Sequence, residues 1–291
     1  MFKGSIVALV TPFKNGKVNE KKINELVEFH IKNKTSGIIP CGTTGESPTL
    51  SYEEHRRVIE IVVKAVRGKI PVMAGTGSNS TEEALELTKF AENAGVDGVL
   101  LVSPYYNKPT QKGLYLHFKK IAESVNIPMI LYNIPGRCGV NIEPETMAKL
   151  SQIKNIIGVK EASGSLDQVS KIIGLCGDNF DVLSGDDSLT LAMMAVGAKG
   201  VISVIANIVP KETADMVDSF LKGNLKKARE LHYKLLPIMK IMFIETSPIP
   251  IKTAMNLAGM DVGELRLPLC EMEENNLKKL QEVLKKYNLM K

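Results

Sequence analysis

The chain has 291 residues, of which 44% are hydrophobic and 24% charged, and it contains no tryptophan. These values are ordinary for a globular protein and exclude a disordered or fibrous chain. The net charge of +5 suits an anionic substrate, but it is too small and too dispersed to indicate a partner made of nucleic acid.

The cysteines and the apolar runs exclude several further classes. None of the four cysteines stands in a C-x-x-C pair, and none is grouped with histidine at metal-ligand spacing. The apolar run Ile6 to Val10 is too short for a signal sequence, and no later run is long enough to span a membrane. We therefore expect a reduced, soluble, cytoplasmic protein that binds no metal.

Apolar runs of about five residues, rich in β-branched side chains, alternate along the chain with amphipathic segments. Because these runs are nearly continuous in hydrophobicity, both faces of the sheet they form should be covered. The predicted strands are Ser5–Val10, Gly37–Pro40, Ile70–Ala74, Gly98–Ser103, Pro128–Tyr132, Ile156–Lys160, Asp181–Ser184 and Gly200–Val204.

Amphipathic segments between these strands predict helices. They are Glu20–Lys34, Glu53–Val66, Thr81–Ala94, Lys112–Ser124, Pro144–Leu150, Leu166–Cys176 and Ser188–Val196. Eight strand–helix alternations in about 205 residues predict an α/β protein with a closed (β/α)8 TIM barrel; a doubly wound open sheet is the other possible architecture.

The strand pattern stops after Pro210, and helical periodicity continues to the end of the chain. It fills Lys211–Leu221, Leu225–Ile244, Ile249–Ala258 and Glu273–Tyr287. We expect a catalytic barrel over residues 1–224 and a helical C-terminal extension over residues 225–291. Since no Gly/Ser linker separates them, the extension should pack on the barrel.

Reactive groups of TIM barrels lie at the carboxyl ends of the strands, and Lys160 ends one of the apolar runs. At the reference pKa of about 10.4, only about one lysine in 2,500 is neutral at pH 7. Burial disfavours the ammonium form, so a lysine here can supply a neutral amine that attacks a carbonyl. Alternatively, Lys160 extends to solvent or pairs with Glu161.

Another strand end carries Gly42–Gly45, in which Thr43 and Thr44 add two hydroxyls to glycine-enabled backbone N–H groups. This combination can hold a carboxylate, although a simple turn with a helix cap would have the same sequence. It is not a P-loop, because no Gly-Lys-Ser/Thr follows, and Gly75–Gly77 is not a dinucleotide fingerprint, because Ser80 occupies the third glycine position.

Two tyrosines and one arginine also follow strands. Tyr106 and Tyr132 could pass protons through a hydroxyl such as that of Thr43, or they could simply fill the core. Arg137 offers a planar fork for a substrate carboxylate, or for a structural salt bridge. All four histidines fall inside predicted helices, which disfavours metal-assisted and Ser-His hydrolase chemistry.

Three stretches together resemble the dihydrodipicolinate synthase family: Gly42–Glu46, Tyr132–Arg137 and Gly158–Ala162. Each is unspecific alone, but the combination is highly specific, and the likeness runs from Phe2 through Pro268. The resemblance implies a lyase that works without a cofactor and condenses pyruvate with L-aspartate 4-semialdehyde in diaminopimelate and lysine biosynthesis.

The resemblance also implies roles for the matching residues. Lys160 would form an imine with pyruvate, and Tyr132 would act as general acid and base, relayed through Thr43 to Tyr106. In the family, the tyrosine that matches Tyr106 reaches into a neighbouring subunit, which implies a homo-oligomer and favours a homotetramer. The expected substrate-binding residues are Thr44, Arg137, Gly185 and the backbone carbonyl of Ile202.

A feedback site for L-lysine is implied as well. The matching residues are Ser47, His55, Asn79, Glu83 and Tyr105, whereas Pro48 and Tyr52 depart from the enterobacterial pattern. Ser247 also replaces the asparagine that is usual in the family's Glu-Thr-Asn-Pro-Ile-Pro stretch.

Two other functions stay open. One is a related Schiff-base lyase, such as an N-acetylneuraminate lyase or a 2-keto-3-deoxy-acid aldolase, which the presence of Arg137 disfavours because those relatives usually lack this arginine. The other is a non-catalytic barrel, which the complete set of candidate catalytic residues disfavours.

Overall fold

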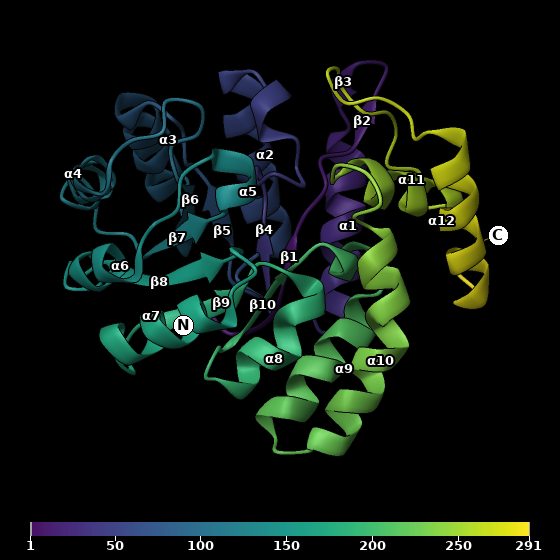
Figure 1. Cartoon of the computed structure of the whole chain (residues 1–291). Helices are drawn as coiled ribbons and strands as arrows, with labels where there is room; N and C mark the ends of the chain where they lie inside the picture. The colour runs from purple at the N-terminus through teal and green to yellow at the C-terminus, as the bar shows by residue number, and fades with distance from the viewer. Residues whose placement is uncertain (1, 291) are drawn as a thin grey trace.

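The computed structural model of the protein describes residues 2–290. Eight parallel strands form one sheet in the order β4-β1-β10-β9-β8-β7-β6-β5, and helices surround it (Figure 1). The strands are β1 Gly4–Ala8, β4 Gly37–Ile39, β5 Met73–Gly75, β6 Gly98–Val102, β7 Met129–Asn133, β8 Ile156–Glu161, β9 Asp181–Ser184 and β10 Gly200–Ser203.

The two ends of this sheet meet. Ile38 of β4 forms a parallel bridge with Val72, and its amide donates to the carbonyl of Pro71 at 3.0 Å. The amide of Gly75 in β5 likewise donates to the carbonyl of Pro40 at 3.0 Å. The sheet is therefore a closed TIM barrel, as predicted, and the open doubly wound alternative is wrong.

The helices follow the predicted amphipathic segments to within a few residues. Their starts are fixed locally, as the capping box before α2 shows. The Ser51 hydroxyl accepts from the amide of Glu54, and the Ser51 amide donates to the Glu54 carboxylate. The barrel helices are α1 Glu20–Lys32, α2 Tyr52–Val66, α3 Thr81–Asn93, α4 Gln111–Ala122, α6 Pro144–Leu150, α7 Leu166–Cys176, α8 Thr190–Ala195 and α9 Pro210–Leu221.

Three further helices form the C-terminal part of the chain: α10 Leu225–Ile241, α11 Ile249–Leu257 and α12 Glu274–Lys286. Helix α10 packs beside α9, and α12 lies against α10 and α11 (Figure 1). Within residues 2–290, no helix has both the length and the apolar character needed to cross a membrane.

Buried apolar side chains form two layers because successive residues of a strand face opposite sides of the sheet. One layer lies between the sheet and the helices and includes Val99, Leu131 and Val159. The other fills the barrel lumen and consists of Phe2, Ile6, Ala8, Ile39, Met73, Leu100, Ile130, Tyr132, Leu183 and Ile202. Burial on both faces explains the continuous hydrophobicity of the strands.

Several short elements were not predicted. They are the hairpin of β2 Phe13–Lys14 and β3 Lys17–Val18, the one-turn helix α5 Pro135–Cys138, and the 3-10 turns η1 Ser47–Thr49, η2 Asp187–Leu189 and η3 Ile205–Asn207. Elements of two to four residues are too short to show a hydrophobic period. The hairpin turn at Asn15-Gly16 places both residues at positive φ, 53° and 75°, as a tight two-residue loop requires.

Candidate active site

Lys160 points into the barrel lumen from β8. The parallel register pairs it with Tyr132 of β7 on one side and with Leu183 of β9 on the other, and both neighbours belong to the lumen layer. The side chain is 6% exposed, and its Nζ lies 4.2 Å from the centroid of the Tyr132 ring. Burial lowers the Lys160 pKa to about 8, Asp187 raises it, and Arg137 lowers it further.

The proposed pairing of Lys160 with Glu161 is wrong. The next residue along a strand faces the opposite side, so Glu161 points into the layer beneath the helices. Its carboxylate accepts from the amide of Ser163 at 2.7 Å, from Asn133 Nδ2 at 3.0 Å and from Gln168 Nε2 at 3.2 Å. Among residues 2–290, no carboxylate lies within ion-pair distance of Lys160, so its ammonium form has no direct counter-ion.

Tyr132 lies beside Lys160 at the top of the lumen and is 6% exposed. Burial raises the pKa of its hydroxyl well above the ordinary value, whereas the charge of Arg137 and a hydrogen bond with the side chain of Thr43 act in the opposite direction. The structure thus brings together Lys160, Tyr132 and Thr43. A neutral phenol next to an amine that is partly neutral can exchange protons with a substrate bound between them.

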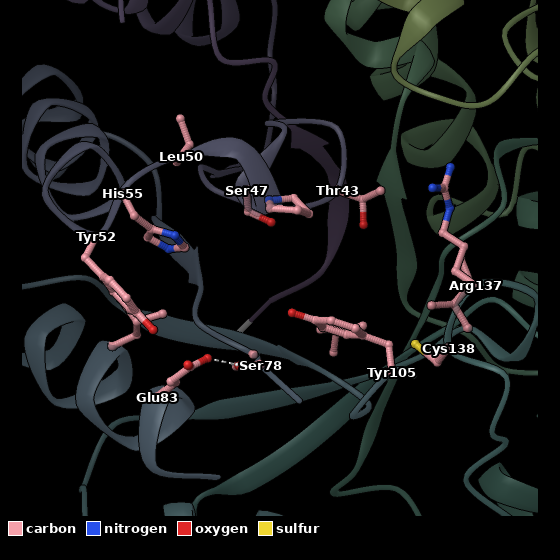
Figure 2. A pocket seen from close by; sticks show the side chains of 15 residues that line it. Thr43, Ser47, Leu50, Tyr52, His55, Ser78, Glu83, Tyr105, Arg137 and Cys138 are labelled. Atoms are coloured by element: carbon pink, nitrogen blue, oxygen red, sulfur yellow. Dashed lines mark hydrogen bonds between the residues drawn. The ribbon is translucent and has the colours of Figure 1, made fainter. Parts of the chain in front are cut away.

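Arg137 belongs to the one-turn helix α5, which directly follows β7. Its guanidinium Nη2 donates to the backbone carbonyl of Ser247 at 2.9 Å, while the hydroxyl of Ser247 is buried without a partner among the described residues. Thr43 and Arg137 line one cavity of about 420 Å³ (Figure 2). The contact with the Ser247 carbonyl therefore orients the guanidinium of Arg137, which borders a cavity that could hold a substrate.

The other predicted binding residues lie around the same end of the barrel. Thr44 is 3% exposed and Ile202 is 1% exposed, the latter within the lumen layer. Gly185 directly follows β9, and a Cβ built on it would lie 3.2 Å from Lys160 Cε and 2.7 Å from Ala162 Cβ. A side chain at position 185 would therefore crowd the amine.

Tyr106 is not brought to this cavity by its own chain. Its side chain is 90% exposed and its φ is 71°, in the left-handed region that non-glycine residues seldom adopt. The backbone thus holds the ring out in solvent, although a large aromatic side chain would normally be buried.

Most residues of the expected lysine site line the same cavity: His55 and Glu83 lie across it from Arg137, and Tyr105 lies beside Cys138 (Figure 2). Ser47, His55, Glu83 and Tyr105 line it together with Tyr52, whereas Asn79 is not among the lining residues. Nε2 of the His55 ring lies 2.8 Å from the carbonyl oxygen of Gly75, and burial lowers the pKa of His55. Glu83 accepts a hydrogen bond from Ser78 Oγ at 2.7 Å.

Asp187 is a charged neighbour of the site to which sequence reasoning assigned no role. It is 2% exposed, and its Oδ2 accepts from the amides of Val204 and Ile205 at 2.9 and 3.1 Å. Its Oδ1 is buried without a partner in the part of the chain that the structure describes. Its position after the end of β9 could have indicated a site residue, because reactive groups of such barrels lie at strand ends. Two adjacent aspartates follow that strand, however, and only the structure shows that Asp187 is the buried one.

A lumen lysine whose pKa burial lowers towards neutrality, placed beside a tyrosine in a (β/α)8 barrel, is the constellation of a Schiff-base-forming lyase, and the chain is an enzyme of that class. Its family follows from the match of residues 1–287 to the model of the Dihydrodipicolinate synthetase family: the chain belongs to this family. Among residues 2–290, no group of three or more His, Cys, Asp or Glu side chains is placed to hold a metal ion.

Named relatives agree over the whole chain. The chain is 61% identical to the 4-hydroxy-tetrahydrodipicolinate synthase of Geotalea uraniireducens, over 100% of both chains. The crystal structure of dihydrodipicolinate synthase from Aquifex aeolicus is 55% identical with a TM-score of 0.98, covering 99% of each chain. That of DHDPS from Cyanidioschyzon merolae with lysine bound is 41% identical with a TM-score of 0.97, also covering 99% of each chain.

Proposed function

We propose that the chain is a synthase that condenses pyruvate with L-aspartate 4-semialdehyde through a Schiff base on Lys160, in the cytoplasmic synthesis of diaminopimelate and lysine. The observation that carries this proposal is the Lys160 amine, buried in the lumen against the Tyr132 ring with a pKa lowered to about 8. The names of full-length relatives support the choice of substrates.

The reaction is nucleophilic catalysis by an amine. Neutral Lys160 attacks the ketone carbon of pyruvate, and loss of water gives an imine whose nitrogen accepts electrons. The methyl group then loses a proton, and the resulting enamine attacks the aldehyde carbon of the second substrate. Finally, the amine of that substrate displaces Lys160 and closes the ring. Tyr132 moves the protons, with Thr43 as its hydrogen-bond partner.

Two separate groups would recognise the two substrate carboxylates. Thr44, in a loop with glycine-enabled amides, would hold pyruvate, with Gly185 and the carbonyl of Ile202 around the imine. Arg137 would meet the carboxylate of the semialdehyde, because its fork borders the cavity and is held by the Ser247 carbonyl.

The test is covalent trapping. Pyruvate with borohydride should add once per chain, at Lys160, and Lys160→Arg should lose both the adduct and turnover, because guanidinium stays protonated at any working pH. An adduct mapped to a different lysine would contradict the mechanism. A coupled assay with the semialdehyde, run beside N-acetylneuraminate, would reveal the related lyase activity if that alternative were correct.

We further propose a homo-oligomer, with a homotetramer as the expected form, in which Tyr106 completes the proton relay of a neighbouring chain. Its outward ring and left-handed backbone support this arrangement. Tyr106→Phe and Lys160→Arg chains, each impaired alone, should recover activity when mixed and reassembled, because some sites then combine an intact Lys160 with an intact Tyr106. No recovery in hybrids verified by mass would argue against sharing between chains.

L-Lysine is proposed to bind on the side of the cavity lined by His55, Glu83 and Tyr105, with Glu83 facing its ammonium group. The lysine-bound relative supports this assignment. Because this ligand would lie away from the Lys160 amine, inhibition would be allosteric. Calorimetry should detect binding of L-lysine to the wild-type protein and a loss of that binding in Glu83→Gln. If neither protein gives a binding signal at millimolar lysine, the proposal is wrong.

A further inference from the structure

The C-terminal part of the chain contacts both of the elements that carry the proposed carboxylate-binding residues. The carbonyl of Ser247 accepts from Arg137 of α5 at 2.9 Å. Five residues later, Lys252 Nζ of α11 lies 2.6 Å from Glu46 Oε1, and Glu46 is two residues beyond Thr44. Residues 247–252 therefore link the loop after β4 to the turn after β7.

The Lys252–Glu46 ion pair is fully enclosed. The side chain of Lys252 is 1% exposed and that of Glu46 is 0% exposed. Lys252 Nζ uses its three donors on Glu46 Oε1 at 2.6 Å, on the Thr11 carbonyl at 3.1 Å and on the Glu264 carbonyl at 2.6 Å. The same nitrogen also lies 4.4 Å from the centroid of the Phe13 ring. No hydrogen of this ammonium group is left for solvent or for a substrate.

Glu46 in turn determines the shape of its loop. Its φ of 53° places it in the left-handed region, a conformation that a glutamate adopts only when its surroundings impose it. Its amide donates to the Thr43 carbonyl at 3.1 Å, and its second carboxylate oxygen accepts from the amide of Arg266 at 3.0 Å. Both carboxylate oxygens are thus bound to the C-terminal part of the chain, and the backbone leads directly back to Thr43.

A hydrophobic contact could fasten α11 to the barrel as firmly, since replacing a buried ion pair by apolar residues is often neutral or stabilising. What an apolar contact lacks is direction: it cannot hold one carboxylate at hydrogen-bond distances from two partners. A displacement of about 1 Å at a binding group can cost about 10²-fold in rate. The ion pair is therefore better suited to positioning than to stabilising.

We propose that Lys252 is a positioning residue for catalysis: through its buried pair with Glu46 it fixes the loop that presents Thr43 and Thr44 to pyruvate. This inference rests on the proposed function and assigns the C-terminal extension a part in the active site. Lys252 itself touches no substrate.

The test compares the Michaelis constants of the two substrates in Lys252→Met, in Glu46→Gln and in the double variant. Each single change leaves one buried charge without its partner, whereas the double change removes both and should restore folding. We expect every variant that is folded by circular dichroism to show an increase of about tenfold or more in the pyruvate KM. The KM for the semialdehyde should stay within about twofold, because the Ser247 carbonyl still holds Arg137.

Lys278→Met is the matched control, because Lys278 pairs with Glu274 on the exposed face of α12 and should leave both constants unchanged. A folded double variant with a wild-type pyruvate KM would overturn the inference and leave Lys252 a structural anchor. Equal increases for both substrates would also overturn it, since they indicate general loosening. Failure of the proposed function is distinct, because the wild-type chain itself would then form no pyruvate adduct at Lys160.

Discussion

Two opposing effects act on the amine of Lys160, and their balance can be measured. Burial lowers its pKa from 10.5 to about 8, against the opposing charge of Asp187. With a pKa of about 8, about 9% of the amine is neutral at pH 7, compared with about 0.03% for a pKa of 10.5. Burial therefore increases the reactive form by about 300-fold at neutral pH, and the charge of Asp187 limits this increase.

Asp187→Asn should remove that limit. The amide has nearly the shape of the carboxylate, and its oxygen can still accept from the amides of Val204 and Ile205. One pKa unit corresponds to about 1.4 kcal/mol, which a unit charge supplies even at about 12 Å when the effective dielectric constant is about 20. We therefore expect the pKa of Lys160 to fall by about one unit, to near 7. The neutral fraction at pH 7 then increases about fivefold.

The assay is the initial rate of borohydride-trapped pyruvate adduct between pH 5.5 and 10. Because only the neutral amine attacks, the rate should decrease as the pH falls through the pKa of Lys160. The midpoint should lie near pH 8 for the wild-type chain and near pH 7 for Asp187→Asn. A midpoint that is unchanged or higher in the variant would refute the role given to Asp187, and a wild-type rate that still rises steeply between pH 9 and 10 would refute the desolvated amine.

Three further predictions follow from other parts of the structure. Arg137→Ala should still form the pyruvate adduct but lose about 10²-fold in turnover with the semialdehyde, since it removes a charge-assisted contact and an orienting group; equal damage to both steps would contradict this. Gly158→Ala should destabilise the fold by several kcal/mol in urea unfolding, because the new Cβ would lie 2.3 Å from the backbone oxygen of Asp181. Gly174→Ala should not, because a Cβ there would meet no atom within 4 Å outside its chain neighbours and the backbone of its own helix. Burial lowers the pKa of His30 to about 3 in the folded chain, against about 6.5 unfolded, so protonation of the unfolded state should begin to destabilise the fold below pH 6.5. By pH 4.5 the wild-type chain should have lost about 2–3 kcal/mol more free energy of unfolding than His30→Gln loses over the same pH range. Identical dependence of the unfolding free energy on pH in the two proteins would contradict this prediction.

Local sequence features predicted the strands and helices of the barrel. The eight strands were predicted because burial on both faces gives each a continuous apolar run. Lys160 drew attention because it ends one of these runs, and its role as the reacting amine stays a prediction. The sequence alone could also have excluded an ion pair between Lys160 and Glu161, since neighbouring residues of a strand point to opposite faces. The hairpin at Phe13–Val18 was missed because two residues per strand carry no period.

What sequence reasoning could not predict depends on contacts between distant parts of the chain. Glu46 and Lys252 are 206 positions apart, and nothing near either residue indicates that they form a pair. The contact of Arg137 with the Ser247 carbonyl spans 110 positions and involves a backbone atom, which no sequence motif records. The division into a barrel over residues 1–224 and an extension over residues 225–291 stays a prediction, because these contacts connect the two regions at the proposed site.

The seam between β4 and β5 has a consequence for how the protein can be observed. A single bridge, Ile38 with Val72, joins these two strands, whereas β7 and β8 pair over five positions. Strand pairing is therefore sparse at this seam, as it also is between β9 and β10, which share one pair. The His55 ring, which lines the cavity, contacts the Gly75 carbonyl at the β4–β5 seam. Local opening is easiest where few hydrogen bonds must break together. Hydrogen exchange at the amides of Ile38 and Gly75 should therefore follow opening of this seam, and it should slow when a ligand fills the cavity.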